Sequence, residues 1–126
     1  MSITSGLSGY VAVTRSSTSA LQPNAQVKYA KIDAAASGDN TLVAAVTGKK
    51  IRVLSLFYLA SGTVTVRFES GASGTALTGQ MEHTAQTGVV LPFNEDGWFE
   101  TASGTLLNVE LNTTVSIDGA LTYIEV

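Results

Sequence analysis

The sequence predicts an all-β domain, an antiparallel β-sandwich of jelly-roll or immunoglobulin-like topology, preceded by an extended N-terminal arm. Three observations predict this fold. Several segments alternate between apolar and polar residues with the period of two that is typical of half-buried strands. Turn residues, mainly glycine, asparagine, aspartate and serine, separate these segments about every ten residues. The one alanine-rich stretch, residues 34–36, is interrupted by Ser37 and Gly38, so no segment is expected to form a helix.

The clearest strands are residues 51–59 and 63–69, which are expected to fold over a tight turn at Ser61 and Gly62. The second strand alternates strictly and directs three apolar side chains inward, those of Val64, Val66 and Phe68. The first strand is apolar on both faces, as in a central strand. Strict alternation places Ile51, Val53 and Phe57 on one of these faces and Leu54, Leu56 and Tyr58 on the other.

The other strands complete the domain. Residues 27–33 form the first strand, residues 34–40 a turn, and residues 41–46 the second strand. Later strands are predicted at residues 78–82 (a weak one), 89–91, 98–101, 106–111, 115–117 and 120–126. The last two flank Asp118 and Gly119, a pair that strongly favours a hairpin turn. About nine short strands at this spacing indicate a sandwich or barrel. The domain is therefore expected to span residues 27–126, and the arm residues 1–26.

Composition excludes several kinds of function. The chain has no cysteine, which excludes disulfides, thiolate metal sites and cysteine nucleophiles and fits assembly in a reducing cytoplasm. The net charge is −3 and the seven basic residues are scattered, which argues against nucleic-acid binding. No apolar stretch is long enough for a membrane helix, and the N-terminus lacks the pattern of a signal peptide. The charged fraction of only 13% suggests that partners cover some apolar surface.

The N-terminal arm, residues 1–26, differs from the rest of the chain. It contains a single charged residue, Arg15, among many serines, threonines and glycines. Two interpretations remain open: a flexible tail, or an arm that orders on a partner or adds a strand to a neighbour's sheet. The second makes Tyr10, Val11 and Val13 the candidate contacts with a capsid or another subunit.

No set of residues suggests catalysis or metal binding. The single histidine, His83, lies in a polar stretch expected at the surface, and no serine lies in a nucleophile elbow. Asp39, Asp96 and Asp118 adjoin glycine or asparagine, which indicates turn formation. Residues 94–96 lack the alternating acidic pattern of a calcium loop. We therefore expect no catalytic residue, no metal, no cofactor and no enzymatic activity.

Trp98 is the single tryptophan of the chain. Because Trp98 and Phe99 are adjacent in a predicted strand, their side chains are expected on opposite faces, and at least one should pack in the core or against a subunit. The alternative is a platform on which a carbohydrate stacks, formed by Trp98 or by Tyr58.

Several turn-and-strand segments resemble those of small virion proteins of tailed phages. They are residues 37–43, 48–53, 97–101 and 119–126, together with Gly104. Some proteins with similar segments resemble capsid decoration, or cement, proteins, and the resemblance covers residues 32–126. It implies a trimeric β-sandwich without enzymatic activity that is made in the bacterial host cytoplasm and binds the major capsid protein on the virion surface. Two alternatives remain: a carbohydrate-binding module at a tail or fibre, and a structural subunit of the tail or baseplate.

Overall fold

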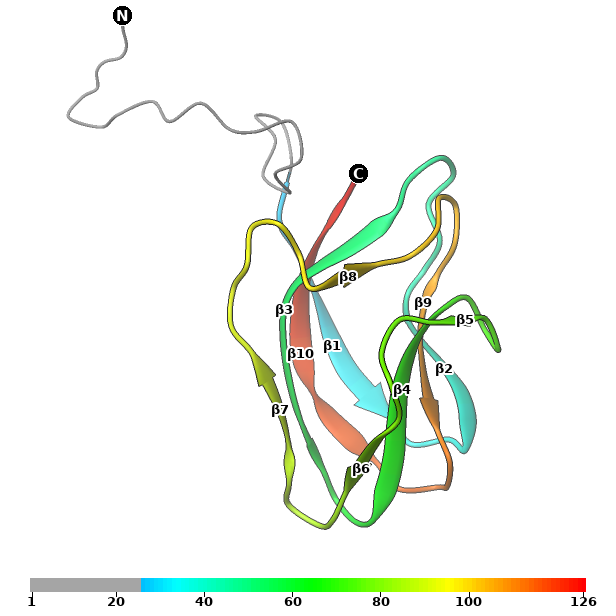
Figure 1. Ribbon diagram of the computed structural model, residues 1–126, viewed down its shortest axis with the longest axis vertical. Coiled ribbons are helices and arrows are strands. Elements are labelled where there is room, and N and C mark those ends of the chain that lie inside the picture. The colour runs from blue at the N-terminus through cyan, green and yellow to red at the C-terminus, as the bar shows by residue number, and fades with distance from the viewer. Residues whose placement is uncertain (1–25) are drawn as a thin grey trace, which may run out of the picture.

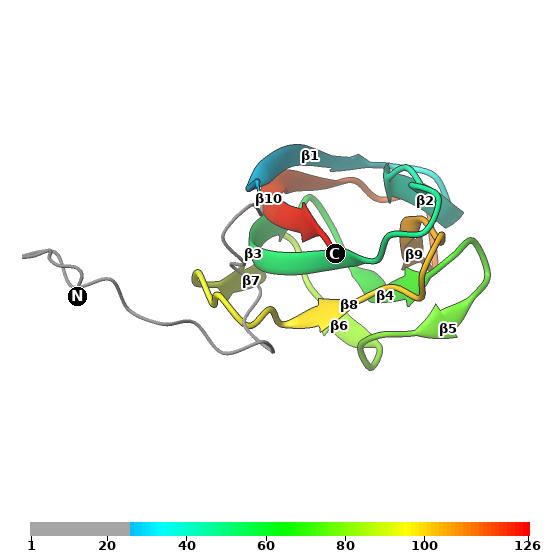
Figure 2. The same ribbon diagram turned by 90° about the horizontal axis from the view of Figure 1, so that it is seen from above.

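The computed structural model describes residues 26–126, and these residues form ten β-strands and no helix. Accordingly, this part of the chain contains no helix that could cross a membrane. Two antiparallel sheets face each other, as predicted for a β-sandwich (Figures 1 and 2). Sheet A consists of β1 (Lys28–Ala34), β10 (Ile117–Glu125), β3 (Ile51–Ala60) and β7 (Gly88–Leu91) in that order, with β8 (Phe99–Glu100) also pairing with β3. Sheet B consists of β2 (Gly38–Val43), β9 (Leu107–Leu111), β4 (Val64–Ser70) and β5 (Thr75–Ala76), with β6 (Met81–His83) also pairing with β4.

The strand order distinguishes between the two predicted topologies. Along the chain, β1 lies in sheet A, β2 in sheet B, β3 in sheet A, β4 to β6 in sheet B, β7 and β8 in sheet A, β9 in sheet B and β10 in sheet A, so the chain changes sheet six times. This repeated exchange between two antiparallel sheets is the jelly-roll arrangement. Figure 1 shows the result, with β7, β3, β10 and β1 forming one wall and β6, β4, β9 and β2 the other.

The core lies between the two sheets and is apolar. Sheet B contributes the inward row of β4, and the prediction that Val64, Val66 and Phe68 face inward is confirmed, since each is at most 2% exposed. Sheet A contributes buried side chains from three strands, namely Ile32, Ile51, Val53, Leu56, Tyr58, Ile117 and Leu121. Tyr58 and Phe68 meet across the core with their ring centroids 6.0 Å apart.

The predicted pairing of β3 with β4 is wrong. The chain does turn at Ser61 and Gly62, but β3 pairs with β10 and β7, whereas β4 pairs with β9 and β6. Both strands carry bulky apolar side chains on their inward faces. These rows face each other across the core, and the turn therefore joins two sheets instead of two neighbours in one sheet.

A β-bulge at Leu54 changes which side of β3 faces the core. Val53 pairs with Tyr123 and Ser55 with Thr122, so Leu54 has no partner across the ladder. Since an extra residue reverses the alternation, Val53 and Leu56 both reach the core, while Leu54 is buried against Ile124 in a separate small cluster. The prediction that Phe57 shares a face with Val53 is therefore wrong.

The hairpin predicted at Asp118 and Gly119 is also absent. Both residues lie inside β10, a continuous strand that pairs with β1 on one side and β3 on the other. A side chain at position 119 would collide with the carbonyl oxygen of Phe57. The glycine is required by the close approach of the two strands, not by a turn.

Candidate interaction surface

The outward surface of sheet A carries a row of apolar side chains across three strands. Phe57 of β3 lies opposite Ala120 of β10 on one side and opposite Val90 of β7 on the other. Directly opposed residues of an antiparallel pair share a face, so these side chains are neighbours. Phe57 is 55% exposed and Val90 is 77% exposed.

Two neighbouring rows extend this surface. Leu59, which is 55% exposed, follows Phe57 on the outward side of β3. On β1, Tyr29 is 81% exposed and lies opposite Thr122, whose hydroxyl bonds that of Ser55 at 2.6 Å. We call the surface formed by Tyr29, Phe57, Leu59, Val90 and Ala120 the apolar face. On the β1 side the apolar face borders charged residues, because Lys31 lies opposite Ala120 and forms an ion pair with Asp33. Its exposed apolar area is on the order of 500 Å², a size that often marks an interaction site on a monomer.

The outward surface of sheet B differs in that charged and amide side chains of three strands form one connected network at its centre. Arg67 Nη2 donates to Glu69 at 2.6 Å and to Glu110 at 2.7 Å. Asn108 Nδ2 donates to the other oxygen of Glu69 at 3.0 Å and to Asp39 at 2.9 Å. Glu69 and Asn108 are fully buried. This surface thus carries a polar network that crosses β2, β9 and β4, in which the Oδ1 atom of Asn108 is buried without a hydrogen-bond partner.

The pKa values in this network follow from those bonds. Hydrogen bonds from the hydroxyl and the backbone N–H of Ser73 hold the pKa of Asp39 below its usual value. The pKa of Glu110 is raised, chiefly by its hydrogen bond with the carboxyl group of Glu69 and then by desolvation, and Arg67 opposes the shift. Structural ion-pair networks commonly perturb pKa values in this way. The sequence placed Asp39 in a turn, but it lies in β2 and fixes the loop that contains Ser73.

The structure corrects two predicted site residues. Tyr58 is only 1% exposed, so a stacking platform there is wrong, and burial raises its pKa to about 12. His83 was expected at the surface but is 8% exposed, and its Nε2 atom lies 2.9 Å from the Tyr58 hydroxyl. The register of β6 explains this, because His83 pairs with the inward-facing Val64 while the adjacent Glu82 faces solvent.

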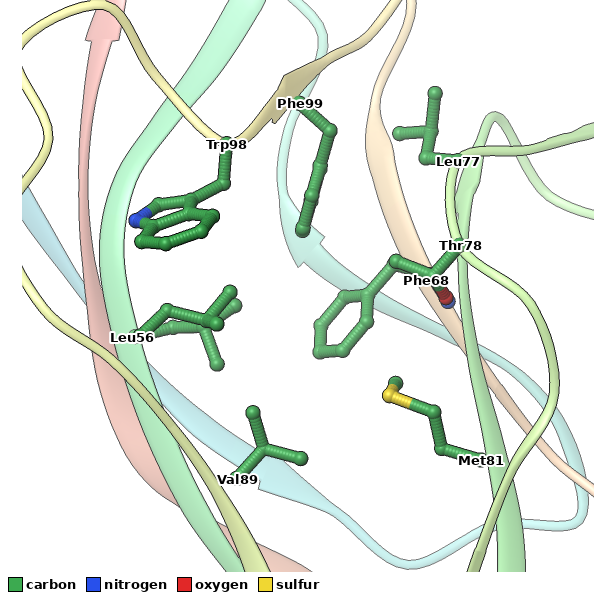
Figure 3. A pocket seen from close by; sticks show the side chains of 9 residues that line it. Leu56, Phe68, Leu77, Thr78, Met81, Val89, Trp98 and Phe99 are labelled. Carbon is green, nitrogen blue, oxygen red and sulfur yellow. The ribbon is translucent and has the colours of Figure 1, made fainter.

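Trp98 is 42% exposed, so its role as a ligand platform stays a prediction. Its indole Nε1 donates to the carbonyl of Pro92 at 2.8 Å, and its backbone N–H donates to Val53. The ring borders an apolar cavity between the two sheets (Figure 3). Phe93, 55% exposed, lies in the same loop. The turn predicted at residues 94–97 is present, because Gly97 N–H donates to the carbonyl of Asn94 at 2.9 Å.

The remaining predicted contacts, Tyr10, Val11 and Val13, lie outside the described residues, as does the arm except for Gln26. Within residues 26–126, no three imidazole or carboxylate side chains are grouped so as to hold a metal ion. Sequence reasoning missed the apolar face. The sequence feature that marks this face is that both sides of residues 51–59 are apolar, but this pattern predicts a strand buried on both faces.

Comparison with known proteins gives little further information. No family model and no curated protein matches the chain. Among solved structures, the chain is similar to one in the cyanophage Pam1 capsid asymmetric unit, with a TM-score of 0.43 and 15% sequence identity. The similarity covers 98% of this chain and 99% of that chain. At this TM-score it carries no argument about function.

Proposed function

We propose that this protein is a structural component of a phage virion that decorates the capsid, binding the outer surface of the head shell as a homotrimer. The observation that carries the proposal is the difference between the two outward surfaces of the sandwich. Sheet A presents large apolar side chains to solvent, whereas the centre of sheet B carries a network of hydrogen-bonded polar side chains. A protein whose task is adhesion needs such a face and needs no catalytic group.

The apolar face supplies the binding energy in this proposal. Covering Phe57, Leu59 and Val90 removes apolar area from water, which favours association. Each copy needs only modest affinity, because the three subunits of a trimer bind the shell together and raise the effective concentration of one another. Residues 1–26, with Tyr10, Val11 and Val13, add a second contact with the major capsid protein or with another subunit.

The test is binding of the purified protein to undecorated heads, measured by co-sedimentation over a range of protein concentrations. We expect saturable binding, and light scattering of the free protein should give three times the monomer mass. Deleting residues 1–25 should weaken binding and leave the circular dichroism spectrum of the sandwich unchanged. Absence of saturable binding would rule out the decoration role.

A matched pair of variants tests the face itself. Val90→Asp places a charge on the apolar face, and Gln80→Glu makes the same change in net charge at an exposed position beyond sheet B. Burying an unpaired carboxylate is strongly unfavourable, so V90D should bind heads at least about tenfold more weakly. Q80E should bind like the wild type. Equal binding by both variants would show that the apolar face is not used.

Carbohydrate binding at a tail or fibre is the second candidate, and the partial exposure of Trp98 and Phe93 favours it. Aromatic rings with one free face are suited to stacking against sugar rings. Titration with host polysaccharides should then quench or shift the fluorescence of Trp98. Gold-labelled antibodies on virions, by marking head or tail, distinguish the two candidates and also detect a tail or baseplate subunit.

A further inference from the structure

An apolar cavity of about 270 Å³ lies between the two sheets, on the side where β6 and β7 do not pair with each other. Figure 3 shows side chains from both sheets directed into it. Sheet A contributes Leu56, Val89 and Phe99, and Trp98 comes from the loop just before β8. The sheet B side contributes Phe68 and Met81, among others.

The walls of this cavity are held in place. Leu56 and Phe68 are at most 2% exposed and belong to long central strands. The rings of Phe68 and Phe99 contact each other with centroids 5.5 Å apart. The segment after β5 is tied to β4, because Leu77 N–H donates to the carbonyl of Phe68 at 2.8 Å. Met81 is the flexible wall, since an unbranched thioether side chain adapts to differently shaped contacts.

The polar side-chain groups of the residues that line the cavity are already hydrogen-bonded. Thr78 is the one lining residue whose side chain has a hydroxyl, and that hydroxyl accepts from Phe68 N–H at 3.1 Å and donates to the carbonyl of Gly79 at 2.9 Å. The indole N–H of Trp98 is bonded to Pro92. No charged side chain lines the space. A charged or hydroxyl-rich molecule would lose its hydration on entry and gain no hydrogen bond in return.

We propose that this cavity is a binding site for one small, uncharged hydrocarbon molecule, such as an alkyl-substituted benzene or a branched aliphatic compound. Apolar cavities of about 150 Å³ remain dry and bind benzene. In the same proportion, a cavity of about 270 Å³ accommodates about eleven carbon atoms. The site is independent of capsid binding, because it opens between the sheets and not on the apolar face.

Two native residues report on the site without an attached probe. Trp98 is the single tryptophan, so intrinsic fluorescence excited at the red edge comes from the rim of the cavity. The chain has two methionines, Met1 and Met81, so the methyl signal of Met81 is readily assigned after isotope labelling. Titration of the full-length protein with propylbenzene should shift both signals saturably. The matched charged analogue, 3-phenylpropanoate, should shift neither.

Neighbouring positions on β7 provide a matched pair of variants. Val89 lines the cavity, whereas Val90 points to the opposite side of the sheet and is 77% exposed. Val89→Phe should fill the space and weaken propylbenzene binding at least tenfold, and Val90→Phe should leave it unchanged. Leu77→Phe, at a partly exposed lining position, provides a second filling variant should V89F fail to fold.

The possible results are decisive in both directions. A saturable response that propylbenzene gives, that 3-phenylpropanoate does not give and that V89F or L77F loses supports the site. The proposal is overturned by no response up to the solubility limit of propylbenzene, by equal binding of the charged analogue, or by undiminished binding in the filling variants.

Discussion

Replacing Gly119 with alanine should destabilise the domain severely, because an added side-chain atom in β10 would collide with the backbone of the neighbouring central strand β3. An added Cβ would lie 2.7 Å from both the carbonyl carbon of Phe57 and the Cα atom of Tyr58, and closer still to the Phe57 oxygen. Real Cβ atoms essentially never approach other heavy atoms within 3.0 Å. The backbone of β10 must therefore move away from β3.

The size of the effect follows from what this movement disrupts. Separating the strands locally breaks two ladder hydrogen bonds at roughly 1 kcal/mol each, and the displaced core adds about 1–3 kcal/mol of strain. We expect a loss of about 3–5 kcal/mol in the free energy of unfolding. For a domain of this size that corresponds to a decrease in Tm of about 10–20 °C. Thermal and urea unfolding followed by circular dichroism measure it.

Two further glycines provide a graded control. At Gly88, an added Cβ would collide with the carbonyl of Tyr58, but β7 is a short strand, so Gly88→Ala should cost less than Gly119→Ala. At Gly79 an added Cβ would have nothing within 4 Å, so G79A should change stability by no more than about 0.5 kcal/mol. If G119A melted within about 4 °C of the wild type, the continuous β10 strand would be wrong and the hairpin predicted at Asp118 and Gly119 would be restored.

Three predictions concern two hydrogen-bonded polar side chains, those of Tyr58 and Asp39. Tyr58→Phe removes the partner of His83 Nε2 in the core and should cost about 1–2 kcal/mol in urea unfolding; wild-type stability in this variant would contradict the hydrogen bond. Folding raises the pKa of Tyr58 from 10.0 to about 12. The resulting contribution to stability is fully present below pH 10 and is lost as the pH rises toward 12. The free energy of unfolding of Y58F should therefore decline less steeply at alkaline pH than that of the wild type. The pKa of Asp39 is lowered from 3.8 by its bonds to Ser73, so its contribution is present above pH 3.8 and is lost as the pH falls through the lowered value. Asp39→Asn should accordingly flatten the acid limb of a plot of Tm against pH, and an unchanged acid limb would contradict this account.

The individual strands could be predicted from the sequence because alternation is a local property. Residues 63–69 alternate strictly, and the inward residues Val64, Val66 and Phe68 are buried as expected. The strands with which a given strand pairs could not be predicted from its own alternation. A turn such as Ser61–Gly62 reverses the chain equally well within a sheet and between sheets, and the choice depends on strands far away in the sequence.

Two errors in the predicted strands have steric causes that no local pattern reveals. At Leu54 a bulge reverses the alternation, so that Phe57 faces solvent although the sequence placed it with Val53. At Gly119, the Asp-Gly signal for a turn is overridden by a close approach between two strands. Both features follow from how β10 and β3 fit together, and neither strand alone contains that information.

The candidate site was harder to predict than the fold. Its main residues, Phe57, Leu59 and Val90, are ordinary strand formers, and only the assembled sheet shows that nothing in the described residues covers them. The same holds for His83, whose polar sequence neighbours suggested exposure but whose strand register places it beside Tyr58.

The contrast between the two sheets also determines the side from which a partner should approach. Covering sheet B would desolvate a network in which Arg67 and Asp39 already have their hydrogen-bond partners, so docking there gains little. Covering sheet A buries the exposed side chains of Phe57 and Val90, which have no polar group to satisfy. The described part of the chain begins at Gln26, just before β1, which is an edge strand of sheet A. Under the proposed function, the apolar face therefore favours attachment on the sheet A side, with the polar face of sheet B turned toward solvent.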